Sequence, residues 1–342
     1  MSCRAVLICP GRGTYNKAEL GYLKRHHAGD ALLARFDDMR RAAGEAPLSE
    51  LDGAARFSTD THGTGDVASP LIYASSLLDA RALAEDIEVV AVTGNSLGWY
   101  SALAAAGALD PEAGFEVVNT MGRLMHEGGA GGQLVYPCTG PDWRPDPARR
   151  AGLIQTIRQI DGHAGVLRLS IDLGGMLVLA GDAEGLAEFE ASVPQIDNRF
   201  PMRLPHHAAF HTDLMAPIAE AGRAALPRDL FGQPKAPMID GRGAIWWPGA
   251  TDTGALYDYT LGAQVTQTYD FARAIRHAAR EFAPDMFIIA GPGTTLGGSV
   301  AQSLIACNWQ GLGDKAAFQI RQDEAPFLVS MGNADQRDIA TG

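Results

Sequence analysis

A serine flanked by glycines, Ser96 in the pentapeptide Gly94-Asn-Ser-Leu-Gly98, is a candidate nucleophile in this 342-residue sequence. An apolar run, Ile87–Thr93, precedes the pentapeptide, and strong helix formers follow it from Trp99 to Ala106. This order predicts a strand, a sharp turn and a helix, in which small flanking residues leave room for a serine in a strained turn. The serine hydroxyl is then exposed, and the amide of Leu97 can point at an oxyanion.

A serine nucleophile needs a base, and one histidine cluster has a suitable context. The segment Pro205–Met215 contains His206, His207 and His211, with small residues between a predicted strand and a predicted helix. The other six histidines lie in polar or amphipathic surroundings without such a context. Spacing does not choose among the three histidines of the cluster.

The elements that must position these residues alternate between strands and helices. Arg4–Cys9 is a short apolar run closed by the turn Pro10–Gly13, and Met286–Ala290 runs into the glycine-rich segment Gly291–Gly298. Such runs predict buried parallel strands with a helix after each turn. We therefore expect an α/β fold with a doubly wound sheet, whose glycine turns gather at the carboxyl ends of the strands, where open α/β sheets bind ligands.

Between residues 129 and 204 the pattern changes to that of a small inserted unit. The segment predicts the order βαββαβ, which is the ferredoxin-like arrangement. Its expected elements are strands at 133–137, 166–172, 176–181 and 199–204 and helices at 147–160 and 183–193. We expect residues 1–128 and 205–330 to form the discontinuous core, residues 129–204 the small subdomain, and residues 331–342 a frayed polar tail.

Composition excludes several classes of protein. With 28 Lys and Arg against 40 Asp and Glu, the net charge is −12, which opposes binding to nucleic acid. No run approaches the roughly 20 apolar residues of a membrane span, and the amino-terminal segment lacks the features of a secretory signal. The four cysteines predict neither a metal site nor a disulfide framework, and we expect a cytoplasmic protein.

Segments in one order along the chain resemble the malonyl-CoA:acyl-carrier-protein transacylases and the related acyltransferase domains of polyketide synthases. The resemblance runs from about Leu7 to Ala301. The similar segments are PGRGTY (P-G-Q-G-S-Q in the family), GNSLGWYSALAAAGAL (G-H-S-x-G-E-Y-x-A-L-x-x-A-G), AAFHTDLM (F-H-S-x-L-M), Gln264-Val265 before DFARAI (Q-L) and GPGTTLGG (G-P-G-x-x-L-x-x).

The resemblance implies a hydrolase-like parallel-sheet core with an inserted ferredoxin-like subdomain and an acyl site between them. It implies a Ser/His dyad in which Ser96 attacks a thioester and His211 acts as base and then as acid. The amides of Leu97 and Arg12 would form the oxyanion hole, and the backbone carbonyl of Gln264 would orient the histidine. A Ser/His/Asp arrangement using Asp110 or Asp213 is the alternative from the residues alone.

Three positions depart from the family pattern. Asn95 replaces a histidine, Trp99 replaces a glutamate, and Met121 replaces the arginine of R-G-x-x-M, which pairs with the free carboxylate of malonyl groups. A thioether cannot form the planar two-bond pair of guanidinium and carboxylate.

The acyl pocket therefore has two interpretations. Met121 is either part of the pocket or core filler on an amphipathic helix, and Arg12 or Arg123 is a candidate to supply the missing cation. Phe210, directly before His211, corresponds to the malonyl-type form of that segment, and its ring disfavours a branched α-carbon. Together with Asn95, these residues are the expected acyl pocket.

The resulting expectation is an acyltransferase that moves a short acyl group, malonyl by family default, from coenzyme A to the phosphopantetheine of an acyl carrier protein. Coenzyme A is then a substrate, and we expect no resident cofactor and no metal. The alternatives are a transacylase for acetyl or another uncharged acyl group, a thioester hydrolase using the same dyad, and a docking subunit that has lost turnover.

Overall fold

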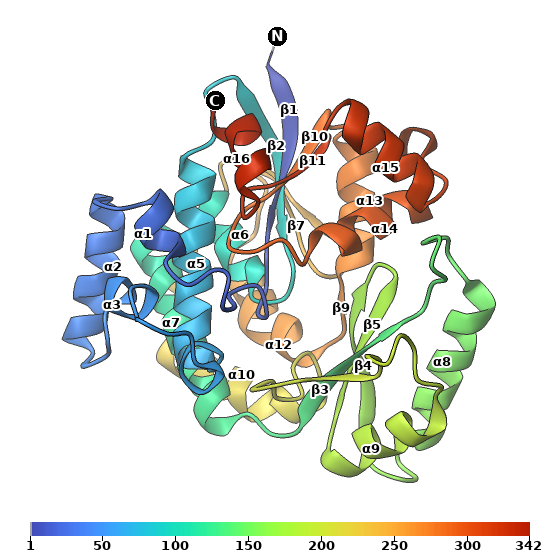
Figure 1. The fold of residues 1–342 in the computed structure, drawn as a ribbon. Helices are drawn as coiled ribbons and strands as arrows, with labels where there is room; N and C mark the ends of the chain where they lie inside the picture. Colours follow the sequence, from blue (N-terminus) through green and yellow to red (C-terminus); the bar gives the residue numbers. More distant parts are fainter. Residues whose placement is uncertain (1) are drawn as a thin grey trace.

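The computed structural model describes residues 2–342 and contains two sheets (Figure 1). The larger has six strands in the order β11-β10-β1-β2-β7-β8. All neighbouring pairs are parallel except β7 with β8. The strands are β1 (Cys3–Cys9), β2 (Ile87–Gly94), β7 (Met238–Ile239), β8 (Ile245–Trp246), β10 (Met286–Ile289) and β11 (Leu328–Ser330).

Helices lie on both sides of this sheet (Figure 1). One group contains α6, which packs on β1 and β2, with α5 and α7 beyond it, and the other contains α13 and α14, which contact β2, β7 and β11. The helices are α1 (Tyr22–His26), α2 (Ala31–Ala42), α3 (Leu48–Asp52), α4 (Thr59–His62), α5 (Gly65–Arg81), α6 (Gly98–Ala105), α7 (Pro111–Gly128), α10 (Ala216–Ala225), α11 (Thr253–Asp258), α12 (Gln264–Thr266), α13 (Phe271–Glu281), α14 (Gly297–Ala306), α15 (Lys315–Glu324) and α16 (Ala334–Thr341).

The smaller sheet has the strand order β6-β3-β5-β4-β9. Its first four strands and two helices follow one another as β3, α8, β4, β5, α9, β6, which is a βαββαβ connection. They are β3 (Gly132–Pro137), α8 (Pro147–Ile160), β4 (Leu167–Leu173), β5 (Met176–Gly181), α9 (Ala183–Ser192) and β6 (Met202–Leu204). The fifth strand, β9 (Tyr269–Asp270), comes from the carboxyl-terminal half of the chain and pairs in parallel with β4, so the two sheets are joined through the segment that leads into α13.

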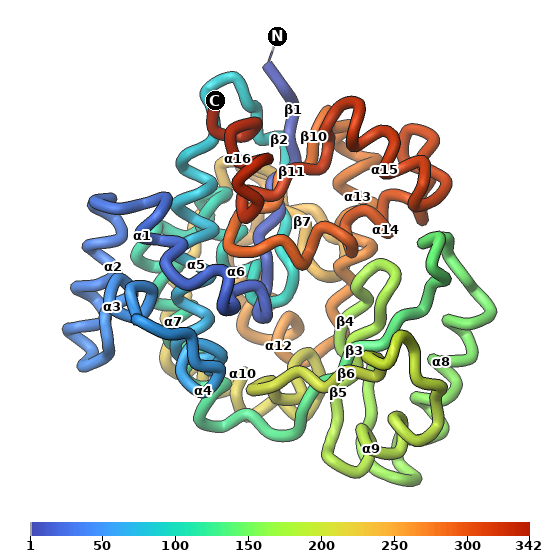
Figure 2. The backbone as a smooth tube through the Cα atoms, in the orientation of Figure 1, coloured from blue at the N-terminus to red at the C-terminus, as the bar shows by residue number. Residues whose placement is uncertain are grey.

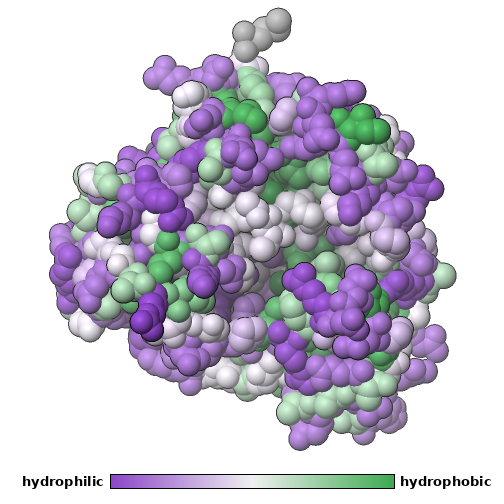
Figure 3. Space-filling model, in the orientation of Figure 1, coloured by the Kyte–Doolittle hydropathy of each residue, from purple (hydrophilic) through white to green (hydrophobic). Residues whose placement is uncertain are grey.

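A continuous apolar core explains why the central strands are apolar runs. Ala5, Val6, Leu7 and Ile8 of β1 are at most 2% exposed, because β1 is paired on both edges and covered on both faces. The backbone tube shows the chain returning repeatedly to this central sheet (Figure 2), whereas hydrophilic residues predominate over the outer surface of the face in Figure 3. Within residues 2–342, no helix is both long and apolar enough to cross a membrane.

The expectation of a frayed tail is wrong. Residues 334–341 form α16, which packs against β11, and Arg337 of this helix is buried with both of its terminal nitrogens hydrogen-bonded. The polar composition of the segment gave no sign of this, because the side-chain partners of Arg337, Tyr22 and Asp79, lie more than 250 positions earlier in the chain.

Candidate active site

The turn that carries Ser96 is tightly packed against the end of β1. Ser96 has a left-handed backbone with φ of 56°, a strained conformation for a residue with a side chain. A β-carbon on Gly94 would collide with the carbonyl of Gly98, and one on Gly98 would collide with the carbonyl of Cys9. The expected strand, turn and helix are thus present, and the two glycines are required because the chain segments approach too closely for any side chain.

Ser96 and His211 meet at the carboxyl end of β2. The Ser96 hydroxyl lies 2.7 Å from Nε2 of His211, and the Nδ1–H of His211 donates to the carbonyl oxygen of Gln264 at 2.6 Å. Because Nδ1 carries the proton for the carbonyl, Nε2 presents its lone pair to the serine hydroxyl. Burial lowers the pKa of His211 to about 4, although the bond to the Gln264 carbonyl opposes this effect, so the imidazole is a neutral base near pH 7.

The structure chooses among the three histidines of the cluster. His206 lies 3.6 Å from Asp60, and His207 hydrogen-bonds the side chain of Gln133 at 2.7 Å, so neither contacts Ser96. His211 reaches the serine because its own backbone is left-handed, with φ of 59°, and its amide donates to the carbonyl of Val265.

The Ser/His/Asp alternative is wrong for this geometry. Asp213 is exposed and lies 3.5 Å from Arg168, and Asp110 is an exposed residue at the start of α7. The Nδ1 position of His211 is occupied by a backbone carbonyl, so the histidine is oriented by a neutral acceptor and not by a carboxylate.

Two tyrosines support the dyad. Tyr269 has no signal in the sequence, whereas Tyr100 matches the tyrosine of the family segment G-H-S-x-G-E-Y. The ring of Tyr269, from β9, lies 5.4 Å from the His211 ring, and its hydroxyl donates to the carbonyl of Gly94 at 2.6 Å. Tyr100 donates to the side-chain oxygen of Gln264, whose Nε2 in turn donates to the carbonyl of Ser96 at 3.0 Å. Gln264 therefore contacts both members of the dyad, the histidine through its carbonyl and the serine through its amide side chain.

The two residues expected to supply oxyanion-hole amides border the dyad. Leu97 directly precedes α6, and the amides of residues 98–100 donate to the carbonyls of residues 95–97, so the amide of Leu97 comes immediately before this run of bonded amides. Gly11, next to Arg12, packs against Asn95, where a β-carbon would lie 2.5 Å from the Asn95 carbonyl. The turn after β1 thus lies beside the serine turn.

The guanidinium of Arg12 is held within the protein. Its Nη2 donates to the carbonyls of Gly63 at 2.6 Å and His206 at 2.9 Å, and its central carbon lies 5.5 Å from the centre of the Phe210 ring. Burial lowers the pKa of Arg12 to about 10, which leaves it charged at neutral pH, and its Nε is buried without a hydrogen-bond partner. This cation therefore lies next to the residue that precedes His211.

The remaining pocket candidates divide into two groups. Asn95 and Phe210 are buried neighbours of the dyad, and the side-chain oxygen of Asn95 has no hydrogen-bond partner. Met121 is completely buried on α7 and packs against α10, with its sulfur 2.6 Å from where a β-carbon of Gly222 would lie. Its thioether therefore fills the interface between two helices.

The proposal that Arg123 supplies the missing cation is wrong. The side chain of Arg123 is 47% exposed and lies 3.6 Å from Glu127. Two positions along a helix correspond to a rotation of about 200°, so Arg123 faces away from the side on which Met121 is buried.

The described residues, 2–342, include no group of three His, Cys, Asp or Glu side chains arranged to hold a metal ion.

Comparisons with known proteins agree with the resemblance expected from the motifs. No protein-family model matches the chain. The polyketide biosynthesis protein ThaF of Burkholderia thailandensis is 29% identical over 236 residues, 68% of this chain and 19% of that protein. The malonyl CoA-acyl carrier protein transacylase of Salmonella typhimurium is 23% identical over 230 residues, 66% of this chain and 70% of that protein. The chain thus spans only about a fifth of ThaF, and it covers 4% of a third relative, the polyketide synthase GfsB of Streptomyces halstedii.

Solved structures extend the likeness of fold to the whole chain. An acyl-carrier-protein S-malonyltransferase from Burkholderia pseudomallei aligns over 98% of both chains with a TM-score of 0.73 and 20% identity. A malonyl-transacylase solved in complex with a type II polyketide acyl-carrier protein aligns over 94% of this chain and 100% of its own, with a TM-score of 0.71 and 18% identity. The chain therefore has the α/β fold of these acyltransferases, with its parallel-sheet core.

Proposed function

We propose that the protein transfers a short acyl group from coenzyme A to the phosphopantetheine thiol of an acyl carrier protein, through an ester on Ser96. The observation that carries this proposal is the contact chain from the Ser96 hydroxyl to His211 and on to the Gln264 carbonyl, at 2.7 Å and 2.6 Å. The likeness to transacylases in sequence and fold supports the choice of a thioester substrate over other acyl donors.

In the proposed reaction, His211 Nε2 takes the proton of Ser96 as the serine oxygen bonds to the thioester carbonyl. The amides of Leu97 and Arg12 stabilise the resulting oxyanion. The carbon–sulfur bond then breaks, and the His211 imidazolium returns the proton to the coenzyme A thiolate. The carrier thiol attacks the ester by the reverse sequence and leaves as the new thioester. Removal of one oxyanion donor from such a site costs about 100- to 1,000-fold in rate.

The acyl group has two candidates, each supported by one observation. The charged guanidinium of Arg12 against Phe210 supports a carboxylated group such as malonyl, with the cation on a different element from the family arginine. The absence of an arginine at position 121 supports an uncharged group such as acetyl, since the position that resembles the family's carboxylate-binding arginine carries no charge. An unpaired buried carboxylate costs several kcal/mol, about 3–5, so the two candidates differ strongly in the donor they accept.

The test is the mass of the intact protein after incubation with malonyl-CoA or acetyl-CoA. A malonyl adduct on Ser96 that persists in Met121→Ala and is lost in Arg12→Met, while the acetyl adduct of the latter variant persists, supports carboxylate binding by Arg12. An exclusively acetyl adduct rejects the carboxylated substrate. Loss of both adducts in Arg12→Met indicates that the variant disturbs the turn after β1 and not the choice of donor.

The fate of the adduct separates transfer from hydrolysis. Decay that accelerates with added carrier protein and yields acylated carrier supports the transferase. Decay to the free acid at a rate indifferent to carrier protein supports a thioester hydrolase. A protein that neither donor nor a fluorophosphonate labels at Ser96 has lost turnover, and the docking subunit is then the correct assignment.

A further inference from the structure

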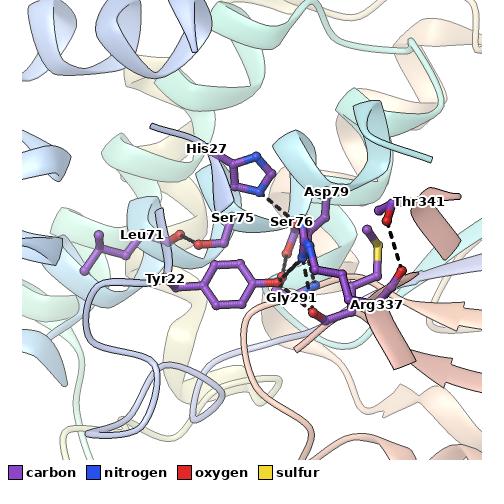
Figure 4. Close-up of polar contacts among 10 residues, drawn as sticks. Tyr22, His27, Leu71, Ser75, Ser76, Asp79, Gly291, Arg337 and Thr341 are labelled. Carbon is purple, nitrogen blue, oxygen red and sulfur yellow. Dashed lines mark hydrogen bonds and ion pairs between the residues drawn. The ribbon is translucent and has the colours of Figure 1, made fainter. Parts of the chain in front are cut away.

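A fully buried carboxylate, Asp79 of α5, lies at the centre of a polar cluster that the proposed chemistry does not use (Figure 4). Its Oδ1 accepts from Nε2 of His27 at 2.8 Å and from Nη2 of Arg337 at 2.7 Å. Its Oδ2 accepts from the hydroxyl of Tyr22 at 2.6 Å and from the backbone amide of Gly291 at 2.7 Å. Three segments distant in the sequence, at 22–27, 291 and 337, thus converge on the side chain of Asp79.

The negative charge of Asp79 is balanced by the positive charge of Arg337, so the cluster can be held in one arrangement in the interior. Burial alone raises the pKa of Asp79, but the hydrogen bonds from His27 and Arg337 and the charge of Arg337 lower it below its ordinary value. The carboxylate therefore remains ionised in the interior, where charge-assisted hydrogen bonds are short and directional. Ser76, on the same helix as Asp79, donates to the carbonyl of Gly291 at 2.6 Å, so both polar groups of that residue are bound from α5.

The loop that Asp79 holds touches the turn expected to supply an oxyanion amide. Gly293 packs so closely on Thr14 that a β-carbon would collide with the Thr14 carbonyl. The Thr14 hydroxyl donates to the carbonyl of Gly11 at 2.9 Å, and Gly11 packs on Asn95, next to the serine. Arg12 thus lies between two contacts, one to the serine turn and one to the loop held by Asp79.

We propose that Asp79 is a positioning residue, which acts through the 291–293 loop and Thr14 to set the direction of the Arg12 amide toward the reacting carbonyl. This proposal rests on the proposed function, because it takes the Arg12 amide as an oxyanion donor. The physical basis is that a misplacement of about 1 Å in a reacting group can cost about 100-fold in rate even when its cause lies outside the site. Because the loop acts on the oxyanion amide in this proposal, the effect is expected in the acylation step and not in donor affinity.

Three variants test this. Asp79→Asn keeps the size of the side chain but replaces one acceptor oxygen by an NH2 group, and Ser76→Ala removes only the bond to the Gly291 carbonyl. Asp37→Asn is the matched control, because Asp37 is also buried, accepts from a backbone amide and a hydroxyl, both of Ser49, and lies beside an arginine on α2. Each variant is compared with the wild type in the single-turnover rate of Ser96 acylation across donor concentrations, at a temperature at which circular dichroism shows all of them folded.

We expect the maximal acylation rate to fall about 10- to 100-fold in Asp79→Asn and about two- to fivefold in Ser76→Ala, with the half-saturating donor concentration unchanged. Asp37→Asn is expected to stay within about twofold of the wild type even if it lowers the melting temperature. An unchanged rate in folded Asp79→Asn, or an equal loss in Asp37→Asn, overturns the proposal. If Asp79→Asn does not fold, Ser76→Ala decides, and an unchanged rate in that variant overturns it.

A fluorophosphonate separates this proposal from the proposed function. It modifies the serine through an oxyanion-bearing intermediate but needs no coenzyme A. If the wild type accepts no acyl group from any coenzyme A donor yet is labelled at Ser96, the proposed function fails. The proposal for Asp79 is then tested by the rates of fluorophosphonate labelling, with the same expected ratios of variant to wild type as for acylation. A wild type that is labelled at Ser96 by neither coenzyme A donor nor the fluorophosphonate refutes both proposals.

Discussion

Two buried histidines in this protein have opposite kinds of partner. His211, at the end of the cluster 205–215, donates to a neutral carbonyl and faces a serine hydroxyl, whereas His27 donates to the carboxylate of Asp79, which also binds Arg337. The histidine whose carboxylate partner resembles part of a Ser/His/Asp triad is therefore not the one that contacts Ser96.

The difference follows from the charge of the partner. A carboxylate on His211 would favour the imidazolium and raise its pKa, whereas the carbonyl leaves burial dominant and the base neutral. At Asp79, the positive charge of Arg337 balances the carboxylate. The cluster therefore holds distant segments together while Asp79 stays ionised. A histidine with a carboxylate partner is thus not in itself evidence of a catalytic site.

The largest expected effect tests the serine itself. Ser96→Ala removes the only atom that can carry the proposed ester, so acylation should fall by at least about 10,000-fold, to no detectable adduct by intact mass. Ser101→Ala is the control, because Ser101 is a buried serine on α6 with no hydrogen-bond partner for its hydroxyl. An adduct that survives in Ser96→Ala would place the nucleophile elsewhere.

The two histidines should separate activity from stability. His211→Ala is expected to lower the acylation rate about 1,000- to 10,000-fold with little change in the melting temperature. His27→Ala is expected to lower the free energy of unfolding by about 1–3 kcal/mol, because it removes a partner of a buried charge, while acylation stays within about tenfold of the wild type. Rates from rapid-quench acylation and melting curves of both variants decide, and the reverse pattern would contradict the comparison.

The pH dependence of acylation should reveal the neutral partner of His211. Since the base must be unprotonated and its pKa is lowered to about 4, the rate should be constant above about pH 5 and fall as the pH drops through about 4. The measurement is kcat/KM for the acyl donor in buffers of constant ionic strength, with a melting curve at each pH. A midpoint near the ordinary histidine value of about 6.5 would show that burial does not control this imidazole.

The smallest expected effect concerns Tyr269, whose ring packs against His211. Tyr269→Phe keeps the ring against the imidazole and removes only the hydrogen bond to the Gly94 carbonyl, so we expect a three- to tenfold loss of acylation rate and a destabilisation of about 1 kcal/mol. Tyr136→Phe is the control, because its hydroxyl likewise donates to a backbone carbonyl, that of Pro194 in the small sheet unit, at 2.7 Å. Equal losses of rate in the two variants would remove Tyr269 from the set of residues that position the dyad.

The sequence by itself determined the local elements and the serine turn. Closely spaced glycines and apolar runs are local properties of the sequence, so the strand and helix around Ser96 could be predicted from them. For α8 and β5 the predicted and observed boundaries agree to the residue. Local patterns could not choose His211 from among the three histidines of its cluster. The resemblance supplied that choice, and it also supplied the role of the Gln264 carbonyl.

Only the tertiary structure decided which distant groups meet. His211 is 115 positions from Ser96, and Arg337 is 258 positions from Asp79, and nothing in the local sequence of either pair encodes the other. For the same reason, the burial of Met121 against α10, the exposure of Arg123 and the order of α16 could not be predicted. Secondary structure depends on neighbours a few residues apart, whereas pairing of buried polar groups depends on the packing of whole elements.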